Sequence, residues 1–523
     1  MWFRNDLRLS DNACVEAAVS AASCGAPVIP VYCLDPRHFA TTRRGHRKTG
    51  AHRALFLLQS LADLRSSLRA RGSDLLVLRG QPEVELPALA SGAHTLVLTQ
   101  TEAASEEAAV DAAVEAALGA QGSVRRLWGS TSLHLDDLPF SPYTNAMPSV
   151  FTPFRSAVEG KAVPRLPLRT ESLPCSLGPL PGSFASALAE PLPGLAALGF
   201  SESEAQAAQV PDERGALRFV GGETAGLARL KHYLWDSNAL ASYFDTRNGM
   251  LGGDYSSKFS PWLAHGCLSP RTVAAECARY ERERVKNKST YWLIFELLWR
   301  DFYHFLFLRH GDAMFHPGGL ARKPWAWRND PAAFAAWKEG RTGHPLVDAN
   351  MRELSSTGFM SNRGRQNVAS FLTQNLGIDW RLGAEHFEAT LNDYDVYSNW
   401  GNWLFAAGIT GGRINVFNIL KQSKDYDADG AYVKHWLPEL RRVPQALIHE
   451  PWRMSPDMQA QAGCLIGVDY PQPMSDKLRG PASAAFSGGS GAGGGRGGGW
   501  AGQGREERRS NNRGRQSEFE RYG

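Results

Sequence analysis

Residues 393–403 read DYDVYSNWGNW and limit the possible folds of this chain more than any other stretch. The segment carries two carboxylates, two amides and two indoles within eleven residues. Aromatic surface of this size is normally buried, whereas Asp and Asn are buried only with hydrogen-bond partners. The composition therefore predicts one wall of a polar-lined, aromatic-backed cavity suited to a planar ligand with many acceptors. A core helix whose polar residues serve as caps is the alternative that the segment alone leaves open.

Motifs elsewhere in the chain favour the cavity. Three of them precede the segment: YSSKFSPW at 255–262, ELLWRDF at 296–302 and STGFMSNRGR at 356–365. In this order they resemble the flavin domain of the photolyase/cryptochrome family, and the resemblance covers about residues 2–452. Four single residues also match: Trp327, Trp380, Asn399 and Trp403. The similarity is greatest to the DASH-type cryptochromes, through WFRNDLR at 2–8, TRNG at 246–249 and YWLIFE at 291–296.

The first 135 residues alternate short β-rich runs with helical patterns. The β-rich runs are at 28–32, 75–78, 95–98 and 124–128, and the helical patterns at 51–68 and 103–118. This rhythm predicts a doubly wound parallel α/β sheet, whose ligands bind beyond the carboxyl ends of the strands. Family members usually carry an apolar strand before the WFR motif, whereas this chain begins at Met1-Trp2. We therefore expect a truncated N-terminus that lacks the first strand and any transit peptide.

The same α/β domain carries an antenna pigment in the family, often a folate. Glu102 stands where DASH-type proteins have a pterin-contacting Glu, although its flanking residues depart from their pattern. The resemblance thus implies a 5,10-methenyltetrahydrofolate antenna that contacts Glu102. The alternative is an acidic first turn of the following helix, which the helix dipole favours.

Periodicity fades between residues 136 and 200, which hold eleven of the thirty prolines. Such sequence cannot continue a helix or a central strand, so we expect a connector between two lobes. From 201 to 455 the pattern is helical, and the resemblance makes this an all-α FAD-binding domain. Residues 292–308 are apolar on most of their circumference and predict a central buried helix. Glu296 and Arg300 lie four apart on it, the favourable spacing for an ion pair.

Residues 456–523 are predicted to form a disordered Gly/Arg-rich tail. Eleven of the seventeen residues at 488–504 are glycine, and glycine at that density cannot offset the entropy of ordering. Gly-Arg-Gly sequence with an aromatic such as Trp500 can hold single-stranded DNA or RNA through charge and stacking. A solvated linker without a partner is the alternative.

The FAD site follows from the resemblance and from residue chemistry. The hydroxyls of Ser256, Ser257 and Ser260 suit a diphosphate, and Lys258 adds charge nearby. An Arg365–Asp393 pair would fix a delocalised cation over a reduced, anionic flavin, and Asn399 would face its N5 atom. The full expected cofactor set is Tyr243, Ser256, Ser257, Lys258, Phe259, Ser260, Glu296, Arg300, Asn362, Arg365, Asp393, Asp395 and Asn399.

The resemblance also implies catalytic and substrate residues. Trp403, Trp380 and Trp327 match the three-tryptophan chain that passes electrons from the surface to the excited flavin. Glu296 and Asn362 complete the expected catalytic set. The expected substrate contacts are Glu296, Trp299, Asn362, Gln366 and Phe405. At position 366, photolyases that repair duplex DNA carry Met, whereas Gln is usual in the DASH branch. At position 405, those photolyases carry Trp, whereas Tyr is usual in the DASH branch.

These residues imply a light-driven lyase that splits cyclobutane pyrimidine dimers. The polar Gln and the smaller Phe make the pocket less complementary to an extruded dimer, so we expect a preference for single-stranded or looped DNA. The alternative function is a blue-light photoreceptor that binds nucleic acid and signals through flavin redox state without significant repair.

Composition narrows the remaining choices. The net charge is +4, and residues from Pro481 onward contribute +3 of it. Because residues 1–480 are almost neutral overall, they need a local basic patch to bind nucleic acid. Seven cysteines show no CxxC pair or zinc spacing, so we expect neither a metal nor disulfides. No apolar run approaches the length of a membrane span. We expect a soluble, intracellular monomer, with chloroplast, mitochondrion or nucleus left open.

Overall fold

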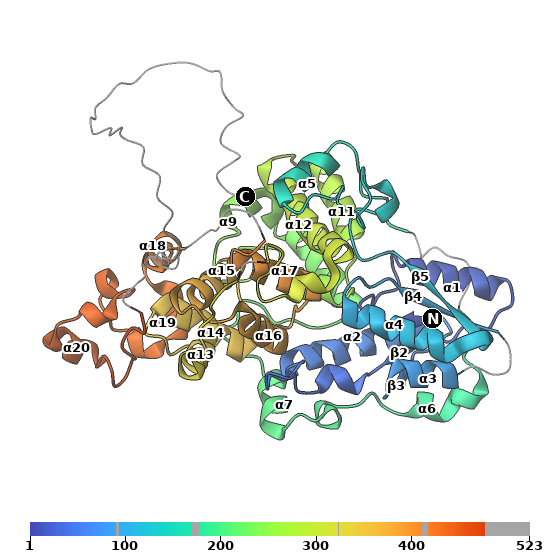
Figure 1. Ribbon diagram of the computed structural model, residues 1–523, viewed down its shortest axis with the longest axis horizontal. Coiled ribbons are helices and arrows are strands. Elements are labelled where there is room, and N and C mark those ends of the chain that lie inside the picture. The colour runs from blue at the N-terminus through green and yellow to red at the C-terminus, as the bar shows by residue number, and fades with distance from the viewer. Residues whose placement is uncertain (90–93, 169–176, 323, 411–416, 476–523) are drawn as a thin grey trace, which may run out of the picture.

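The computed structural model describes residues 1–89, 94–168, 177–322, 324–410 and 417–475. Figure 1 shows an α/β domain, a helical domain packed beside it and a smaller group of helices at the far end. The tail from 476, with its predicted disorder and nucleic-acid contacts, lies outside the described residues.

The α/β domain is built on a five-stranded parallel sheet in the order β3-β2-β1-β4-β5. Its strands are β1 (Trp2–Phe3), β2 (Val31–Cys33), β3 (Leu76–Leu78), β4 (Thr95–Gln100) and β5 (Gly122–Leu127). Its helices are α1 (Ala13–Ser23), α2 (Ala51–Arg69), α3 (Pro82–Ala88) and α4 (Ser105–Leu118). The strand order reverses at β1, which makes this the predicted doubly wound sheet with its switch point between β1 and β4.

The expectation of a missing first strand is wrong. Trp2 pairs with Val31 of β2 and with Thr99 of β4, so β1 is a short strand at the centre of the sheet. Phe3 pairs with Tyr32 and is fully buried.

The connector contains α5 (Phe151–Val158) and α6 (Ala185–Ala189). The helical domain follows with α7 (Glu202–Gln209), α8 (Glu223–Lys231), α9 (Tyr243–Thr246), α10 (Ser260–Ala264), α11 (Pro270–Glu283), α12 (Lys288–His310), α13 (Pro331–Lys338), α14 (Pro345–Thr357), α15 (Asn362–Ser370), α16 (Trp380–Thr390), α17 (Val396–Ala406), α18 (Ile419–Tyr426), α19 (Ala431–Trp436) and α20 (Pro456–Ala462). No described helix has the length and apolarity needed to cross a bilayer.

The expected start of the tail at residue 456 is too early. Helix α20 and the residues after it fold against a second apolar core, in which Cys464 and Tyr470 are fully buried. The Tyr470 hydroxyl donates to Asp348 Oδ2 on α14 at 2.6 Å. The helical domain therefore extends to at least residue 470, because a polar, glycine-poor segment can be held by a few buried aromatic anchors.

Helix α12 is the central buried helix that its composition predicts. Asn287 caps it by accepting hydrogen bonds from the backbone N–H groups of Ser289 and Thr290 at 2.8 and 3.1 Å. It ends at His310, and the φ of +49° at the following Gly311 suits glycine. Such capping by Asn is worth about 1 kcal/mol. The helix thereby presents fixed side chains to α5 on one side and to α17 on the other.

Two carboxylates of the helical domain, the buried Asp301 and the half-buried Glu223, hold the α/β domain in place. Asp301 of α12 accepts hydrogen bonds from the backbone N–H groups of Ser132 and Leu133 at 3.0 and 2.9 Å. Glu223, at the start of α8, does the same for Leu9 and Ser10 at 2.7 and 2.9 Å. Burial raises the pKa of Asp301 to about 6. These bonds fix the seam at which the candidate site residues of both domains meet.

Candidate functional site

Helix α17 brings the segment 393–403 into the core. Asp395 is its N-cap and accepts hydrogen bonds from the backbone N–H groups of Tyr397 and Ser398. Asn399 is buried and donates from Nδ2 to the carbonyl of Ala384 at 3.1 Å, which leaves its own carbonyl oxygen available. The segment is thus a capped core helix and also a source of inward polar groups. The two interpretations of its sequence are compatible.

The predicted Arg365–Asp393 pair is present. Arg365 Nη2 lies 2.7 Å from Asp393 Oδ2, and Ser260 Oγ donates to the same oxygen at 2.6 Å. The Asp393 side chain is only 1% exposed. Its other oxygen, Oδ1, is buried without a hydrogen-bond partner among the described residues. Because an unpaired buried acceptor is costly, this atom marks a place where a ligand N–H group would fit.

The hydroxyl turn before α10 is held from behind by Arg229 of α8. The guanidinium donates to the carbonyls of Gly253, Ser256 and Ser257 at 3.0, 3.1 and 2.9 Å. Within the described ranges, the Ser256 and Ser257 hydroxyls donate no hydrogen bond, so both remain available to a phosphate. Sequence reasoning missed Arg229, since nothing in its sequence neighbourhood indicates that it organises a distant turn.

Lys258, which was expected to add charge near the hydroxyl turn, is buried. Its backbone has a φ of +53°, and Nζ donates to the carbonyl of Gly253 at 3.0 Å while lying 3.2 Å from the centre of the Tyr255 ring. Burial lowers the pKa of Lys258 to about 7. The ammonium is therefore turned toward backbone and an aromatic face, and desolvation weakens its charged form.

Two expected aromatic contacts lie behind the turn. Tyr243 of α9 and Phe259 are both buried and both pack edge-on against Tyr233, with ring centroids 6.3 and 5.8 Å away. Burial raises the pKa of the Tyr243 hydroxyl. These rings provide an apolar backing beside the polar atoms of the turn.

The expected ion pair between Glu296 and Arg300 is wrong. Glu296 Oε1 accepts a hydrogen bond from Trp292 Nε1 at 3.1 Å. Arg300 instead donates to the carbonyls of Ser130 and Leu263, the latter at 3.2 Å. Its guanidinium thus binds two backbone carbonyls instead of the Glu296 carboxylate. Burial raises the pKa of Glu296, and the nearby Arg247 opposes that shift.

The expected substrate residues come from three helices, with Glu296 and Trp299 on α12, Asn362 and Gln366 on α15, and Phe405 on α17. We refer to these five residues as the mouth. Trp299 is stacked face to face on Phe151 of α5, with ring centroids 3.6 Å apart, and meets the edge of Phe405 at 6.3 Å. One indole face is therefore already covered. Gln366 Oε1 accepts from Arg363 Nη1 at 2.9 Å, while Asn362, the first residue of α15, is exposed. Sequence reasoning missed Phe151 because its partner lies on a different helix.

The three expected tryptophans are linked through Gly383 and the carbonyl of Pro317. Trp403 and Trp380 are buried and Trp327 is half-buried. The Trp403 ring rests on Gly383 of α16, where an added Cβ would lie 2.2 Å from ring atom Cη2. Gly383 is three residues after Trp380 on that helix. Trp380 and Trp327 both donate their indole N–H to the carbonyl of Pro317, at 3.2 and 3.3 Å.

Comparison with known proteins identifies the family. The model for the FAD binding domain of DNA photolyase matches residues 292–485, and the model for DNA photolyase matches residues 1–172. The Cryptochrome DASH of Gloeobacter violaceus is 52% identical over 487 residues, which cover 92% of this chain and 94% of the relative. The chain belongs to the photolyase/cryptochrome family, in its DASH branch.

Solved structures agree with this assignment. The crystal structure of a Synechocystis cryptochrome matches with a TM-score of 0.84 and 48% identity, covering 91% of this chain and 95% of that one. A bacterial class III photolyase from Agrobacterium tumefaciens matches with a TM-score of 0.73 and 30% identity, covering 91% and 93%. The helical domain is thus an FAD-binding domain. The cluster around Asp393, together with the Ser256–Ser257 hydroxyls, suits that cofactor.

In this DASH-branch protein Glu102 lies at the switch point of the sheet. It follows β4, is only 6% exposed, and accepts hydrogen bonds from Tyr397 Oη at 2.7 Å and from Asn5 Nδ2 at 3.3 Å. The alternative of an acidic helix start is wrong, because α4 begins three residues later and has other acidic residues in its first turn. Burial raises the pKa of Glu102 to about 7. Tyr397 belongs to α17, so one helix touches both the FAD site and the switch point.

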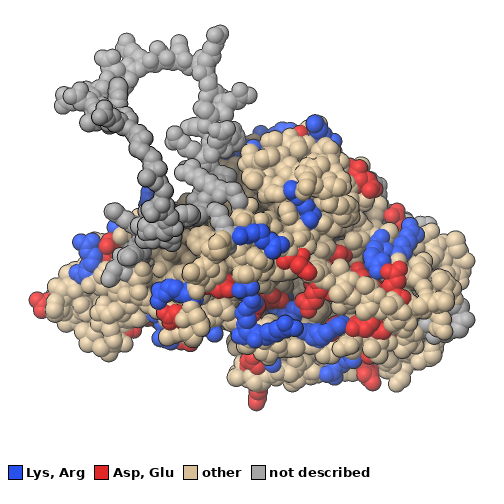
Figure 2. Space-filling view, viewed as in Figure 1, with Lys and Arg blue, Asp and Glu red and all other residues tan. Residues whose placement is uncertain are grey.

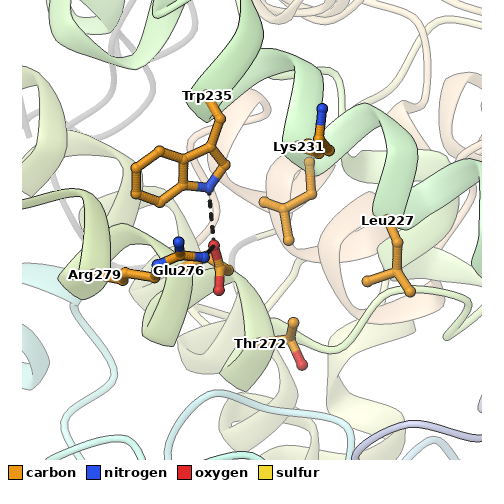
Figure 3. Close-up of a pocket in the computed structure, with 7 residues that line it drawn as sticks. Leu227, Lys231, Trp235, Thr272, Glu276 and Arg279 are labelled. Atoms are coloured by element: carbon orange, nitrogen blue, oxygen red, sulfur yellow. Dashed lines mark hydrogen bonds and ion pairs between the residues drawn. The ribbon is translucent and has the colours of Figure 1, made fainter. Parts of the chain in front are cut away.

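A cavity of about 460 Å³ lies elsewhere, between α8 and α11. Figure 3 shows Trp235, Glu276 and Arg279 along it, with the indole N–H donating to Glu276 at 2.9 Å. The expected FAD and substrate residues are not among those that line it.

Surface charge is mixed. On the face in Figure 2, Lys and Arg side chains are interspersed with Asp and Glu, and the basic ones gather in a short band low on this face. Within the described residues, no group of three or more His, Cys, Asp or Glu side chains converges as a metal site.

Proposed function

We propose that this protein splits cyclobutane pyrimidine dimers under blue light, with a preference for single-stranded or looped DNA. The observation that carries the proposal is that Glu296, Trp299 and Asn362 of the mouth are not buried, whereas Asp393 of the ion pair with Arg365 is buried in the FAD-binding domain. When bound and reduced, FAD supplies the electron that opens the cyclobutane ring.

Glu296 is suited to donate a hydrogen bond to a base carbonyl. Its pKa is raised by burial, so the carboxyl holds its proton at a higher pH than an exposed Glu does. Trp292 already occupies one of its oxygens at 3.1 Å and fixes the side-chain orientation. Asn362 can contact the same bases with its amide from the start of α15.

Trp299 offers one stacking face to the dimer. Phe151 covers the opposite face at 3.6 Å and holds the indole plane in place. A single stacked base gains roughly 1–3 kcal/mol. Extrusion of bases from a duplex costs a few kcal/mol. Stacking on one aromatic face therefore offsets that cost at best. This balance supports a preference for dimers that are already unpaired.

The substrate pocket is more polar than one that captures extruded dimers. Gln366 is bonded to Arg363, whose Nη2 also donates to Asn248 Oδ1 at 2.9 Å. A base that contacts Gln366 must compete with this network. The same observation favours the second candidate function, a blue-light photoreceptor that binds nucleic acid and signals through flavin redox state.

We further propose a folate antenna, 5,10-methenyltetrahydrofolate, at the switch point. Glu102, with a pKa raised to about 7, can accept from or donate to a pterin ring. Asn5 and Tyr397 hold its two oxygens in place. The position beyond the carboxyl ends of β1 and β4 is where doubly wound sheets bind ligands.

The deciding experiment is blue-light reversal of a single dimer in a defined oligonucleotide, compared as single strand and as duplex at the same salt concentration. We expect faster repair of the single strand. Equal rates on both forms would contradict the pocket argument. No repair of either form by protein that holds reduced FAD would favour the photoreceptor function.

A further inference from the structure

The cavity between α8 and α11 has the size and lining of a site for a small organic molecule. Its volume of about 460 Å³ lies within the usual range of ligand pockets, and its wall is mainly apolar. Leu227 and Leu230 of α8 and the indole of Trp235 supply the apolar part (Figure 3). Leu227 is 38% exposed, so a bound apolar group would remove its side chain from water.

Trp235 is fixed in its orientation before any ligand arrives. Its indole N–H donates to Glu276 Oε2 at 2.9 Å, and the Tyr280 ring packs against it with centroids 5.6 Å apart. Trp235 lies on a π-helical turn, His232–Asp236, that continues α8, and such turns are frequent at functional sites. An aromatic side chain that is already held in place loses little freedom when a flat ring packs on it.

The charged side chains that line the cavity favour an anion. Two of the three are cations, Lys231 and Arg279, while the third, Glu276, accepts the indole N–H and lies 3.5 Å from Arg279. Lys231 and Arg279 are exposed, and their other partners are the exposed carboxylates of Asp236 and Glu283. Because exposed ion pairs contribute little to stability, the carboxylate of a ligand can replace these partners.

We propose that this cavity binds a planar aromatic carboxylate and that the bound ligand slows the release of FAD. The aromatic ring packs on Leu227, Leu230 and Trp235. The carboxylate pairs with Lys231 and Arg279. No residue of the mouth lines the cavity, so the proposal does not depend on dimer repair.

Helix α8 connects the cavity to the FAD site. Leu230 lines the cavity, and its neighbour Arg229 donates to three backbone carbonyls at the hydroxyl turn. Tyr233, two residues before Trp235, packs edge-on against Tyr243 with ring centroids 6.3 Å apart. A ligand that restrains α8 therefore restrains the turn and the ring that are expected to hold FAD. Since coupling between two binding sites is reciprocal, FAD should also raise the affinity of the cavity for its ligand.

The test uses the full-length flavoprotein in the dark and three probes that share one ring system. They are the anion 1-naphthoate, the uncharged 1-naphthylmethanol and the cation 1-naphthylmethylamine. Titration followed by ligand-observed NMR should give a Kd of roughly 1 mM or lower for 1-naphthoate, as expected for a ligand of this size. The alcohol should bind about fivefold more weakly, the upper end for loss of an exposed charge pair, and the amine more weakly still.

Two variants locate the binding site of the probes. Thr272→Trp fills the cavity from α11 and should abolish the binding of all three probes. Arg279→Gln removes one cation, so it should weaken 1-naphthoate about fivefold and leave the alcohol unaffected. Arg282→Gln is the matched control, because Arg282 is an exposed arginine of the same helix that does not line the cavity. Its affinity for 1-naphthoate should equal that of the wild type.

The rate of FAD release is the second measurement. Saturating 1-naphthoate should slow the appearance of fluorescent free FAD in the wild type and have no effect in Thr272→Trp. Equal affinity for the three probes, or 1-naphthoate binding that survives Thr272→Trp, would overturn the site. If Thr272→Trp does not fold, unchanged affinity for 1-naphthoate in Arg279→Gln would overturn it. Binding that leaves FAD release unchanged would overturn the coupling through α8.

Discussion

The FAD-binding core and the substrate mouth share helices but differ in how their polar groups are held. In the core, Asp393 is 1% exposed and is bonded to both Arg365 and Ser260. At the mouth, Asn362 is exposed, and the one side-chain hydrogen bond of Gln366 within the described part of the chain is with Arg363. Buried polar groups must find partners, so residue identity nearly dictates the contacts in the core. At the mouth, water can replace any partner, and several arrangements are compatible with one sequence.

The largest expected effect is on the core. Asp393→Ala leaves the Arg365 guanidinium without its carboxylate, which should lower the free energy of unfolding by roughly 3–5 kcal/mol and release FAD. Denaturant titration and flavin stoichiometry measure both. Asp425→Ala, which removes an exposed pair with Lys421, is the control and should cost less than roughly 1 kcal/mol. If Asp393→Ala retains its full complement of FAD, the polar contacts of the core are as replaceable as those of the mouth, and the comparison fails.

Trp403→Phe should strongly slow photoreduction while FAD stays bound, because phenylalanine is much harder to oxidise than tryptophan. The measurement is the loss of oxidised flavin absorbance under blue light with an external reductant. Trp436→Phe, a similarly buried tryptophan in the second apolar core, is the matched control. An unchanged rate in Trp403→Phe would mean that the series beside the FAD site does not carry electrons.

Glu296 tests the mouth through pH. Burial raises the pKa of this carboxyl, so its proton is present at low pH and is lost as pH rises through the raised value. Repair should therefore fall over that interval, and Glu296→Gln, which always carries a donor, should flatten the profile. Glu296→Ala should impair repair of single strands and duplex alike. A wild-type profile that is flat across this range would exclude Glu296 as the donor.

A smaller effect is expected from restoring the apolar pocket. Gln366→Met with Phe405→Trp removes the acceptor of Arg363 and enlarges the stacking surface, which adds roughly 1–3 kcal/mol per stacked base. Repair of duplex should rise relative to single strand, as measured with the two oligonucleotide forms at matched salt. An unchanged ratio would mean that the limit lies outside the mouth.

The smallest effect concerns neither region. Deletion from residue 488 should weaken binding of single-stranded nucleic acid and reduce its salt dependence. The slope of log binding constant against log salt concentration should become shallower by roughly 0.7 for each phosphate that is no longer neutralised. Fluorescence anisotropy over a salt series measures this. Photoreduction of the flavin should stay the same. Identical affinity and slope with and without these residues would make them a passive linker.

Local sequence predicts much of the fold because periodicity and caps act over short distances. The alternation in the first 135 residues predicts the sheet, and the apolar circumference of residues 292–308 predicts the buried helix α12. The short β1 was missed, because two residues show no periodicity. Its place in the sheet depends on Val31 and Thr99, which lie far away in the chain.

The candidate site was predictable only where burial restricts the choice of partner. Helical spacing allowed an ion pair of Glu296 with Arg300 but could not reveal the carbonyl of Ser130, 170 residues away, which Arg300 binds instead. The surroundings of Lys258 were hidden for a related reason, since its positive φ and its contact with the Tyr255 ring are properties of the folded turn. The stacking of Phe151 on Trp299 is likewise a tertiary contact without a local signal.

The carboxylate bonds across the domain seam have a consequence for biosynthesis. Asp301 is synthesised 169 residues after Ser132, from whose backbone N–H it accepts a hydrogen bond. Glu223 is synthesised 214 residues after Leu9, from whose backbone N–H it accepts another. Domains generally fold as they leave the ribosome, the N-terminal one first. The nascent sheet therefore emerges with these amide groups still bonded to water, and they dock only after α8 and α12 have been synthesised. Ribosomal pausing between these two helices would prolong the interval in which this surface is open to chaperones.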